Sequence, residues 1–126
     1  MCIRDRYTAA FQDRIRKWVE KGRIRYIPKA SQKELALIYR NSDIFVFTSN
    51  YEIFGMVLLE ALYFGLPVIS SANGGASVLI REGENGFMMQ GFHVPDWERK
   101  LTFVLELSLI HIWKSGWQRM TVKYAV

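Results

Sequence analysis

Two glutamates flank a glycine that the sequence predicts to lie at the head of a helix. Glu52 precedes Gly55 by three residues, and Glu60 follows it by five. A glycine there lets a ligand approach the unpaired backbone N–H groups of the first turn, which together with the helix dipole favour phosphate. Glu60 lies in an almost wholly apolar segment, where a carboxylate needs a partner such as the vicinal hydroxyls of a ribose. These residues therefore indicate a candidate site for a phosphate and a sugar.

Simpler structural roles also explain the same residues. Ser49 and Glu52 have the spacing of a capping box, so Glu52 could serve only to cap a helix. Glu60 could face solvent or pair with a lysine or an arginine. The paired glycines Gly74 and Gly75 follow a second predicted strand and allow close approach of a ligand, but a tight turn would need them equally. From the residues alone, both kinds of role stay open.

The elements that position these residues follow from hydrophobic periodicity. The pattern predicts helices at about 8–21, 32–40, 55–64, 77–81 and from Asp96 onward, and short strands at 24–27, 43–48, 66–70 and 87–89. Residues 44–47 within the predicted strand 43–48 are continuously apolar, which suits a strand buried on both faces of a parallel sheet. Strands alternating with helices predict an α/β fold, partial and Rossmann-like, with a short parallel sheet flanked by helices. Ligands in such sheets bind at the carboxyl ends of the strands.

Composition and charge exclude several classes of protein. The chain has 126 residues, a formal net charge of +5, a single cysteine and 50% hydrophobic residues. A disulfide scaffold and a disordered chain are excluded, and no apolar stretch is long enough to span a bilayer. Residues 7–106 hold 12 Lys and Arg against 11 Asp and Glu, so their net charge is only +1. The basic character therefore belongs mostly to the two ends.

Those two ends carry peptides that can be translations of one DNA element. Residues 1–6 and 107–112 back-translate to opposite strands of the same short sequence, which resembles a sequencing-library transposon end read through as protein. Foreign segments are set apart before a fold is inferred. We therefore expect residues 1–6 to be a non-native leader, residues 7–106 to be the interpretable domain, and residues 107–126 to be a non-native tail.

One basic cluster remains inside the interpretable domain, within the first predicted helix and just after it. Its members are Arg14, Arg16, Lys17, Lys21, Arg23 and Arg25. They alternate with an apolar stripe and are interspersed with Asp13 and Glu20, which is typical of a solvated helix face. A protein that binds nucleic acid or an anionic membrane is an alternative that rests on this charge alone. We expect no nucleic-acid partner.

The order of motifs along the chain carries a resemblance that single residues do not. The motifs are Thr48-Ser49 at the end of a buried strand, Glu52, Phe54-Gly55, Glu60-Ala61-Leu62, Gly65-Leu66-Pro67-Val68-Ile69, Gly74-Gly75 and Gly83-Glu84-Asn85-Gly86. In this order and spacing, the segment of about 24–106 resembles the nucleotide-sugar-binding half of the GT-B glycosyltransferases. It is most similar to the retaining family four, glycosyl transferases group one, which shares an E-x7-E motif. The resemblance implies the C-terminal, donor-binding part of a longer enzyme.

The resemblance implies an activity and a role for each matching residue. Members transfer a sugar with retention from a nucleotide diphosphate sugar to a lipid, polysaccharide or small-molecule acceptor, without a metal or cofactor. It implies a cytoplasmic enzyme that can associate peripherally with the inner face of the membrane. Glu52 would be the catalytic residue, beside the donor sugar, and Glu60 would bind the ribose. The donor's sugar and phosphates would meet the backbone of Phe54, Gly55, Met56 and Val57, and the base and loop contacts would come from Lys29, Ala30, Gly74 and Gly75.

Two positions depart from the family's pattern. Pro28 stands where the family has a glycine in the turn that binds the base, and Val78 stands near a position that is usually acidic. These departures support an alternative, a nucleotide-sugar-binding paralogue without catalytic activity. The basic residues that neutralise the diphosphate in the family, and its acceptor-binding domain, would lie upstream of this chain. We therefore expect the chain by itself not to turn over substrate.

Overall fold

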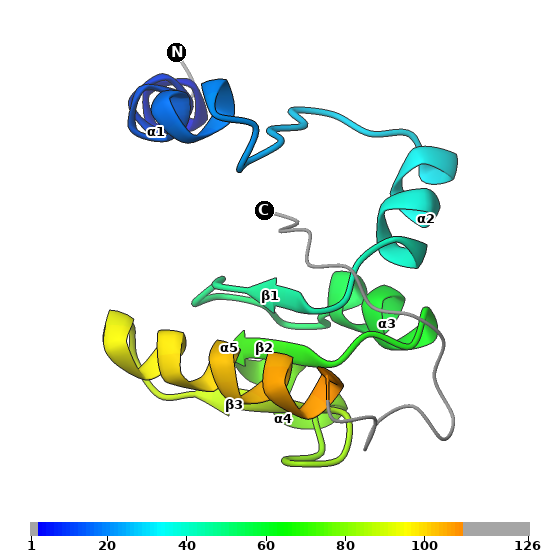
Figure 1. Ribbon diagram of the computed structural model, residues 1–126. Helices are drawn as coiled ribbons and strands as arrows, with labels where there is room; N and C mark the ends of the chain where they lie inside the picture. The colour runs from blue at the N-terminus through cyan, green and yellow to red at the C-terminus, as the bar shows by residue number, and fades with distance from the viewer. Residues whose placement is uncertain (1–2, 110–126) are drawn as a thin grey trace. The chain divides into compact units, whose positions relative to one another are not determined.

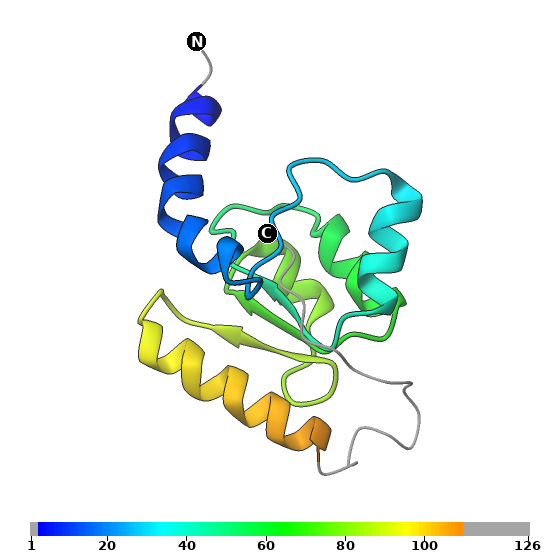
Figure 2. The same cartoon turned by 45° about the horizontal axis from the view of Figure 1, so that its top comes forward.

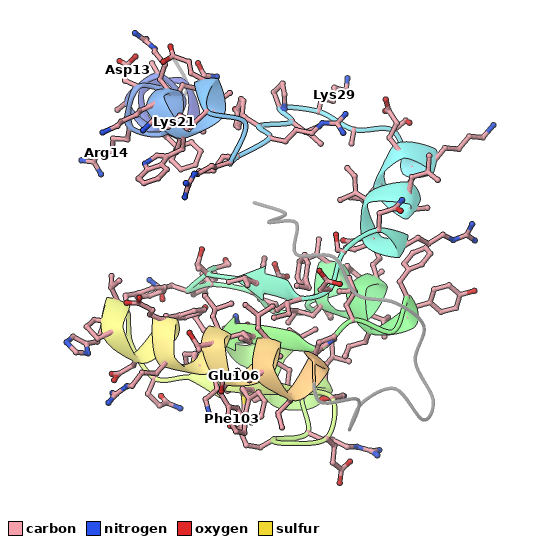
Figure 3. The ribbon with its side chains drawn as sticks, viewed as in Figure 1. Asp13, Arg14, Lys21, Lys29, Phe103 and Glu106 are labelled. Carbon is pink, nitrogen blue, oxygen red and sulfur yellow. The ribbon has the colours of Figure 1, made fainter. Side chains whose placement is uncertain are left out.

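The chain divides into two compact units, Met1–Ala30 and Ser31–Val126, and the computed structural model describes residues 3–109. The first unit contains α1 (Ile3–Glu20), which begins five residues before the predicted helix. Its end has a turn in which Gly22 takes a φ of +66° and donates its N–H to the carbonyl of Val19 at 2.9 Å. Figure 3 shows Asp13 and Arg14 on this helix and Lys21 just after it, and all three are exposed. Their exposure fits the prediction of a solvated helix face.

The predicted strand at 24–27 is wrong. These residues are irregular in the structure, and the described strands pair only with one another, in the order β1-β2-β3. A strand is held by hydrogen bonds to a neighbouring strand, and β-branched residues alone do not supply them. Within this unit the segment instead packs locally, with the ring of Tyr26 centred 6.2 Å from that of Phe11 on α1.

The second unit is built on a short parallel sheet (Figure 1). Its strands are β1 (Phe45–Phe47), β2 (Val68–Ser71) and β3 (Gly86–Met89). Val46 lies opposite Ile69, which in turn lies opposite Phe87. Gly86 is required where β3 begins, since a Cβ there would come within 2.3 Å of the carbonyl oxygen of Val68. The predicted α/β fold with a short parallel sheet is confirmed.

Helices cover both faces of this sheet. The α2 helix (Gln32–Arg40), the α3 helix (Met56–Tyr63) and the α4 helix (Gly74–Leu79) share one core with the sheet, and α5 (Val94–Leu109) forms a second core on the other face. Figure 2 shows the strands between α5 and the pair α2 and α3. The alternation of side chains along β2 explains the two cores, because Val68 enters the first and Ile69 the second. The sheet of the second unit is thus the middle of three layers.

Local sequence signals define the ends of α2 and α3. Ser31 and Glu34 form the predicted capping box, with the Ser31 N–H donating to Glu34 Oε2 at 2.8 Å and the Glu34 N–H donating to Ser31 Oγ at 3.3 Å. At the end of α3, Gly65 takes a φ of +80°. Its N–H donates to the carbonyl of Leu62, and the next N–H, that of Leu66, donates to Ala61. This is the Schellman arrangement, which turns the chain directly into β2.

The α5 helix extends through residue 109, and the remainder of the predicted tail lies outside the described residues. Figure 3 labels two residues of this helix, Phe103 and Glu106, and both are exposed. The ammonium of Lys100 lies 4.2 Å from the centre of the Phe87 ring and 5.6 Å from that of Phe103. None of the helices in the described part of the chain has the length and apolar character needed to cross a membrane.

Substitution of two neighbouring leucines of α3 tests which face of the helix is buried. Leu58 is 0% exposed in the core shared with the sheet, whereas Leu59 is 48% exposed. We expect Leu58→Ala to lower the free energy of unfolding by about 2–5 kcal/mol, because it leaves a cavity in a close-packed core. We expect Leu59→Ala to lower it by less than about 1 kcal/mol. Urea unfolding of both variants measures the difference, and equal losses would contradict the assigned face of α3.

Candidate functional site

The carboxyl ends of β1 and β2 are joined by hydrogen bonds to a single backbone carbonyl. The carbonyl oxygen of Ser49, just after β1, accepts from Ser71 Oγ at 2.6 Å and from Asn73 Nδ2 at 2.9 Å. Ser71 ends β2, and Asn73 caps the helix that follows it. The loop from β1 to α3 is therefore held against the loop from β2 to α4, at the edge of the sheet where ligands of α/β folds bind.

The predicted capping box of Ser49 and Glu52 does not form. Ser49 Oγ donates to the carbonyl of Tyr51 at 3.3 Å, and the N-cap of α3 is Gly55, with φ +62° and ψ +38°. Glu52 nevertheless serves this helix end, because its Oε1 accepts from the Gly55 N–H at 3.2 Å. The Glu52 carboxylate thus lies at the positive end of the α3 dipole, the place where an anion is most stabilised. The alternative role of Glu52, at the start of a helix, is therefore seen as this bond to Gly55 and not as a capping box with Ser49.

The glycine pair Gly74 and Gly75 lies directly against this loop. The Gly75 N–H donates to the carbonyl of Glu52 at 2.9 Å. A Cβ on Gly75 would lie 2.7 Å from the Gly55 nitrogen and 2.9 Å from its Cα, distances that no side chain tolerates. Gly75 is therefore needed for contact between two backbones. The prediction that these glycines also contact a ligand stays a prediction.

The N-termini of α3 and α4 differ in how their N–H groups are bonded. In α4, the Ala76 N–H donates to Asn73 Oδ1 at 2.9 Å, and the Gly75 N–H is bonded to the loop. In α3, the first bond within the helix runs from Leu59 to Gly55. Among the described residues, the N–H groups of Met56, Val57 and Leu58 have no acceptor. The α3 terminus is thus the open one, as helix starts are when no side chain caps them.

Residues 54–57, at the head of α3, differ in how far they are exposed. The Phe54 and Met56 side chains are exposed, Val57 is partly buried in the core, and Gly55 is buried. A ligand at this helix end would therefore meet backbone N–H groups next to exposed apolar side chains. The backbone role expected of these four residues toward a donor stays a prediction.

Glu60 pairs with Tyr39, a residue of the predicted helix at 32–40 to which the sequence analysis assigned no role. Tyr39 OH, on α2, donates to Glu60 Oε2 at 3.1 Å. Burial, and next the negative charge of Glu60 and the hydrogen bond to it, raise the pKa of the Tyr39 phenol well above its ordinary value. Neither a lysine nor an arginine forms an ion pair with Glu60 in the described part of the chain. A tyrosine that is buried in an apolar stripe needs a partner for its hydroxyl, and this requirement was the signal available in the sequence.

The remaining predicted residues lie elsewhere or are not tested. Lys29 is exposed and Ala30 partly buried, and both belong to the first compact unit with Pro28, so their contact with a base stays a prediction. Val78, on α4, is 82% exposed. Among the described residues, no three His, Cys, Asp or Glu side chains are grouped as metal ligands.

A groove of about 380 Å³ lies away from the predicted site. It is lined by Met89, Asp96, Arg99, Lys100 and Phe103. The carboxylate of Asp96 accepts hydrogen bonds from Arg99 and from His93, and these bonds, led by that of Arg99, lower the pKa of Asp96. None of the predicted site residues lines this groove.

Comparison with known proteins decides the family. The family described as "Glycosyl transferases group 1" matches residues 6–115, most of the chain. The chain belongs to this family. Membership in glycosyl transferases group 1 agrees with the resemblance seen in the order of motifs, and with the α/β architecture of the second unit.

Proteins of Mycobacterium and Rhodococcus are among those similar to this chain. A protein of Mycobacterium sp. (strain KMS) named D-inositol 3-phosphate glycosyltransferase is 35% identical over 83 residues, 66% of this chain and 19% of its own length. Proteins of the same name from Rhodococcus erythropolis and Rhodococcus opacus are 39% and 38% identical, over 60% and 64% of this chain and 17% and 18% of their own lengths. The chain thus aligns with about a fifth of the length of these relatives. No solved structure matches it significantly.

The contact between Gly75 and Gly55 leads to a prediction about stability. We expect Gly75→Ala to lower the free energy of unfolding by about 1–3 kcal/mol or more, because the added methyl group forces the two loops apart. Gly74→Ala is the matched control, since a Cβ there would come no closer than 3.3 Å, to the carbonyl oxygen of Glu52. Urea unfolding midpoints compare the two variants. A Gly75→Ala protein as stable as the Gly74→Ala protein would contradict the described packing.

The raised pKa of Tyr39 leads to a second prediction, about alkaline pH. The folded protein holds the phenol proton more tightly than the unfolded chain, whose tyrosines ionise near pH 10. This stabilising contribution is therefore complete below about pH 10 and is lost as the pH rises further. The measurement is the tyrosinate absorbance as a function of pH, for the wild type and for Tyr39→Phe. The difference between the two curves should show a phenol that ionises only above the usual pH range of tyrosine or when the protein unfolds. A difference signal with its midpoint near pH 10 would contradict the bond to Glu60.

Proposed function

We propose that this chain forms the donor-binding part of a glycosyltransferase that uses a nucleotide diphosphate sugar. The observation that carries the proposal is the β1–α3 junction, in a chain of the glycosyl transferases group 1 family. This junction combines open N–H groups at the head of α3 with the carboxylates of Glu52 and Glu60. Phosphate binds to the uncapped N–H groups at the N-terminus of a helix, and carboxylates accept hydrogen bonds from sugar hydroxyls. The donor contains both groups.

The diphosphate would bind at the head of α3. The N–H groups of Met56 and Val57 would donate to phosphate oxygens, where the helix dipole adds a favourable field. Glu52 holds the neighbouring Gly55 N–H in the absence of a ligand. A donor phosphate would compete for that N–H, and release of Glu52 would free its carboxylate to accept from the hydroxyls of the donor sugar. The backbone N–H groups of Phe54 and Gly55 would then complete the contact with the donor.

Glu60 would accept hydrogen bonds from the ribose of the nucleotide. It lies four residues after Met56, so both residues share one face of α3, about 6 Å apart along the axis at 1.5 Å per residue. A carboxylate that is partly buried between α2 and α3 already accepts one hydrogen bond, from Tyr39. Each carboxylate oxygen can accept more than one, so a ribose hydroxyl can be added without removing this bond.

The reaction would break the bond between the anomeric carbon and the diphosphate oxygen. Fixed N–H dipoles at the head of α3 stabilise the negative charge that grows on the leaving diphosphate, which lowers the barrier. Retention, part of the proposal, requires the acceptor hydroxyl to attack from the face that the diphosphate leaves. Its proton then passes to the departing phosphate oxygen. No cofactor enters this scheme, because the donor carries its own leaving group.

The acceptor and the catalytic turnover belong to a longer protein in this proposal. The chain corresponds to about a fifth of the relatives' length, and we propose that the transfer needs residues beyond that fifth. The names of the relatives make D-inositol 3-phosphate the first acceptor to test, ahead of lipids and polysaccharides.

A second candidate is a paralogue that binds the donor without transferring the sugar. Val78 favours it, because an apolar side chain that is mostly exposed on α4 stands near the position where the family pattern is acidic. Both candidates bind a nucleotide sugar, and they differ only in turnover. Joining the chain to the upstream region of its parent gene and assaying sugar transfer to D-inositol 3-phosphate distinguishes them.

Substitution of Glu60 tests the proposed function directly. We expect Glu60→Gln to weaken nucleotide-sugar binding about 10- to 100-fold, because hydrogen bonds to a charged group are worth about 1.5–3 kcal/mol. Calorimetric titration with UDP-, GDP- and ADP-sugars measures the effect on the 126-residue chain. Glu98→Gln, at an exposed position on α5, is the control and should bind as the wild type does.

Two outcomes would contradict the proposed function. One is that the wild-type chain binds none of the three nucleotide sugars. The other is that Glu60→Gln binds as well as the Glu98→Gln control. Salt-dependent binding to duplex DNA or to anionic vesicles, with no nucleotide-sugar binding, would favour the alternative based on the basic cluster of α1.

A further inference from the structure

Tyr39 is the buried polar side chain nearest to the proposed ribose contact, and nothing in the motif pattern assigns it a role. It is 3% exposed on α2 and reaches across to α3, where its hydroxyl donates to Glu60 Oε2 at 3.1 Å. Its ring is stacked on Phe64, with centroids 5.4 Å apart and planes at 19°, and meets the edge of Phe45 at 5.8 Å. The hydroxyl is therefore held in place by a ring that the core has immobilised.

This hydrogen bond restricts the Glu60 side chain. A glutamate side chain has several rotatable bonds, and in a partly open position its carboxylate samples many orientations. A donor fixed by the core selects those in which Oε2 faces α2. The bond is charge-assisted, and such bonds are stronger than those between neutral groups. The carboxylate is thus oriented before any ligand arrives.

Orientation in advance has a consequence for binding. A vicinal diol offers two hydroxyls at a fixed separation, and a carboxylate accepts both only in a narrow range of orientations. If the side chain were ordered only by the ligand, the lost rotamer freedom would weaken the affinity. A carboxylate oriented in advance avoids this loss of entropy on binding. The gain applies only to ligands whose hydroxyls donate hydrogen bonds to the carboxylate. The preformed orientation should therefore raise the affinity for nucleotides with ribose hydroxyls and improve the discrimination against nucleotides that lack them.

We propose that Tyr39 is a positioning residue that orients the Glu60 carboxylate to accept the two ribose hydroxyls of the nucleotide. The inference rests on the proposed function and adds to it a residue on α2. It requires the phenol hydroxyl itself, since the Tyr39 ring would still pack on Phe64 and Phe45 without it. A purely structural role for Tyr39 would not depend on whether the nucleotide has ribose hydroxyls.

The experiment compares two tyrosines that contact the same phenylalanine. Tyr39→Phe removes the hydroxyl that reaches Glu60 and keeps the ring. Tyr63→Phe is the matched control, because Tyr63 also meets the Phe64 ring, at 5.4 Å, while its own side chain is 84% exposed. Calorimetry measures the Kd of UDP, GDP and ADP for the 126-residue chain, and then the Kd of the 2′,3′-dideoxy form of whichever binds most tightly. Circular dichroism checks that each variant is folded.

We expect Tyr39→Phe to bind the ribonucleotide about 3- to 10-fold more weakly than the wild type, as for a side chain that must be ordered on binding. Its affinity for the dideoxy form should be unchanged. The Kd of the dideoxy form divided by the Kd of the ribonucleotide should therefore be smaller for Tyr39→Phe than for the wild type. Tyr63→Phe should keep both values. Tyr39→Phe combined with Glu60→Gln should bind no more weakly than Glu60→Gln alone, because the hydroxyl acts through the carboxylate.

The outcomes separate this inference from the proposed function. If Glu60→Gln loses affinity while Tyr39→Phe keeps the wild-type ratio, the positioning role is overturned and the proposed function stands. If the wild type binds no nucleotide, or binds ribose and dideoxy forms equally, both are overturned. If Tyr39→Phe does not fold, 3-fluorotyrosine at position 39 keeps the hydroxyl and provides a fluorine signal. That signal should shift with the ribonucleotide and not with the dideoxy form, and no shift with a bound ribonucleotide would overturn the positioning role.

Discussion

The close contact between two loop backbones is the constraint on which the rest of the site depends. Gly75 lies so near Gly55 that no side chain fits between them, and its N–H donates to the carbonyl of Glu52. Two hydrogen bonds to the Ser49 carbonyl, from Ser71 and Asn73, hold the same loops together. Because the contact places the β1–α3 loop, it also places the glutamate and the start of α3. A parallel sheet brings such loops to one edge, and small residues let them meet.

The N-termini of α3 and α4 meet at this edge of the sheet and have different roles. The α4 terminus is satisfied by Asn73 and by the loop, so it contributes packing. The α3 terminus keeps open N–H groups, with the carboxylate of Glu52 beside them. From the other side, Tyr39 connects α2 to Glu60 within the core that the helices share with the sheet. Rigid packing thus surrounds a small polar surface, the arrangement expected where a ligand must be oriented.

Several features were predictable because their causes are local in sequence. The capping box of α2 and the glycine turn after α3 depend on residues within a few positions of each other. The buried strands were recognisable from continuous apolar runs, and the family from the order of its motifs. The strand expected at 24–27 was wrong, because a strand requires a neighbour. The capping box that the spacing of Ser49 and Glu52 allowed does not form, because Gly55 is the N-cap of α3 and Ser49 Oγ donates to the carbonyl of Tyr51.

The sequence by itself determined the kinds of elements, their order and the family, and it identified Glu52, Gly55 and Glu60 as the residues of interest. Only the tertiary structure decided what these residues contact. Tyr39 and Glu60 are 21 residues apart in the chain, and no spacing rule connects a buried phenol on one helix with a carboxylate on another. The need of Gly75 to be a glycine was likewise a matter of packing between two loops. Periodicity reports which face of an element is buried, whereas a hydrogen-bond partner is chosen by the fold that brings two faces together.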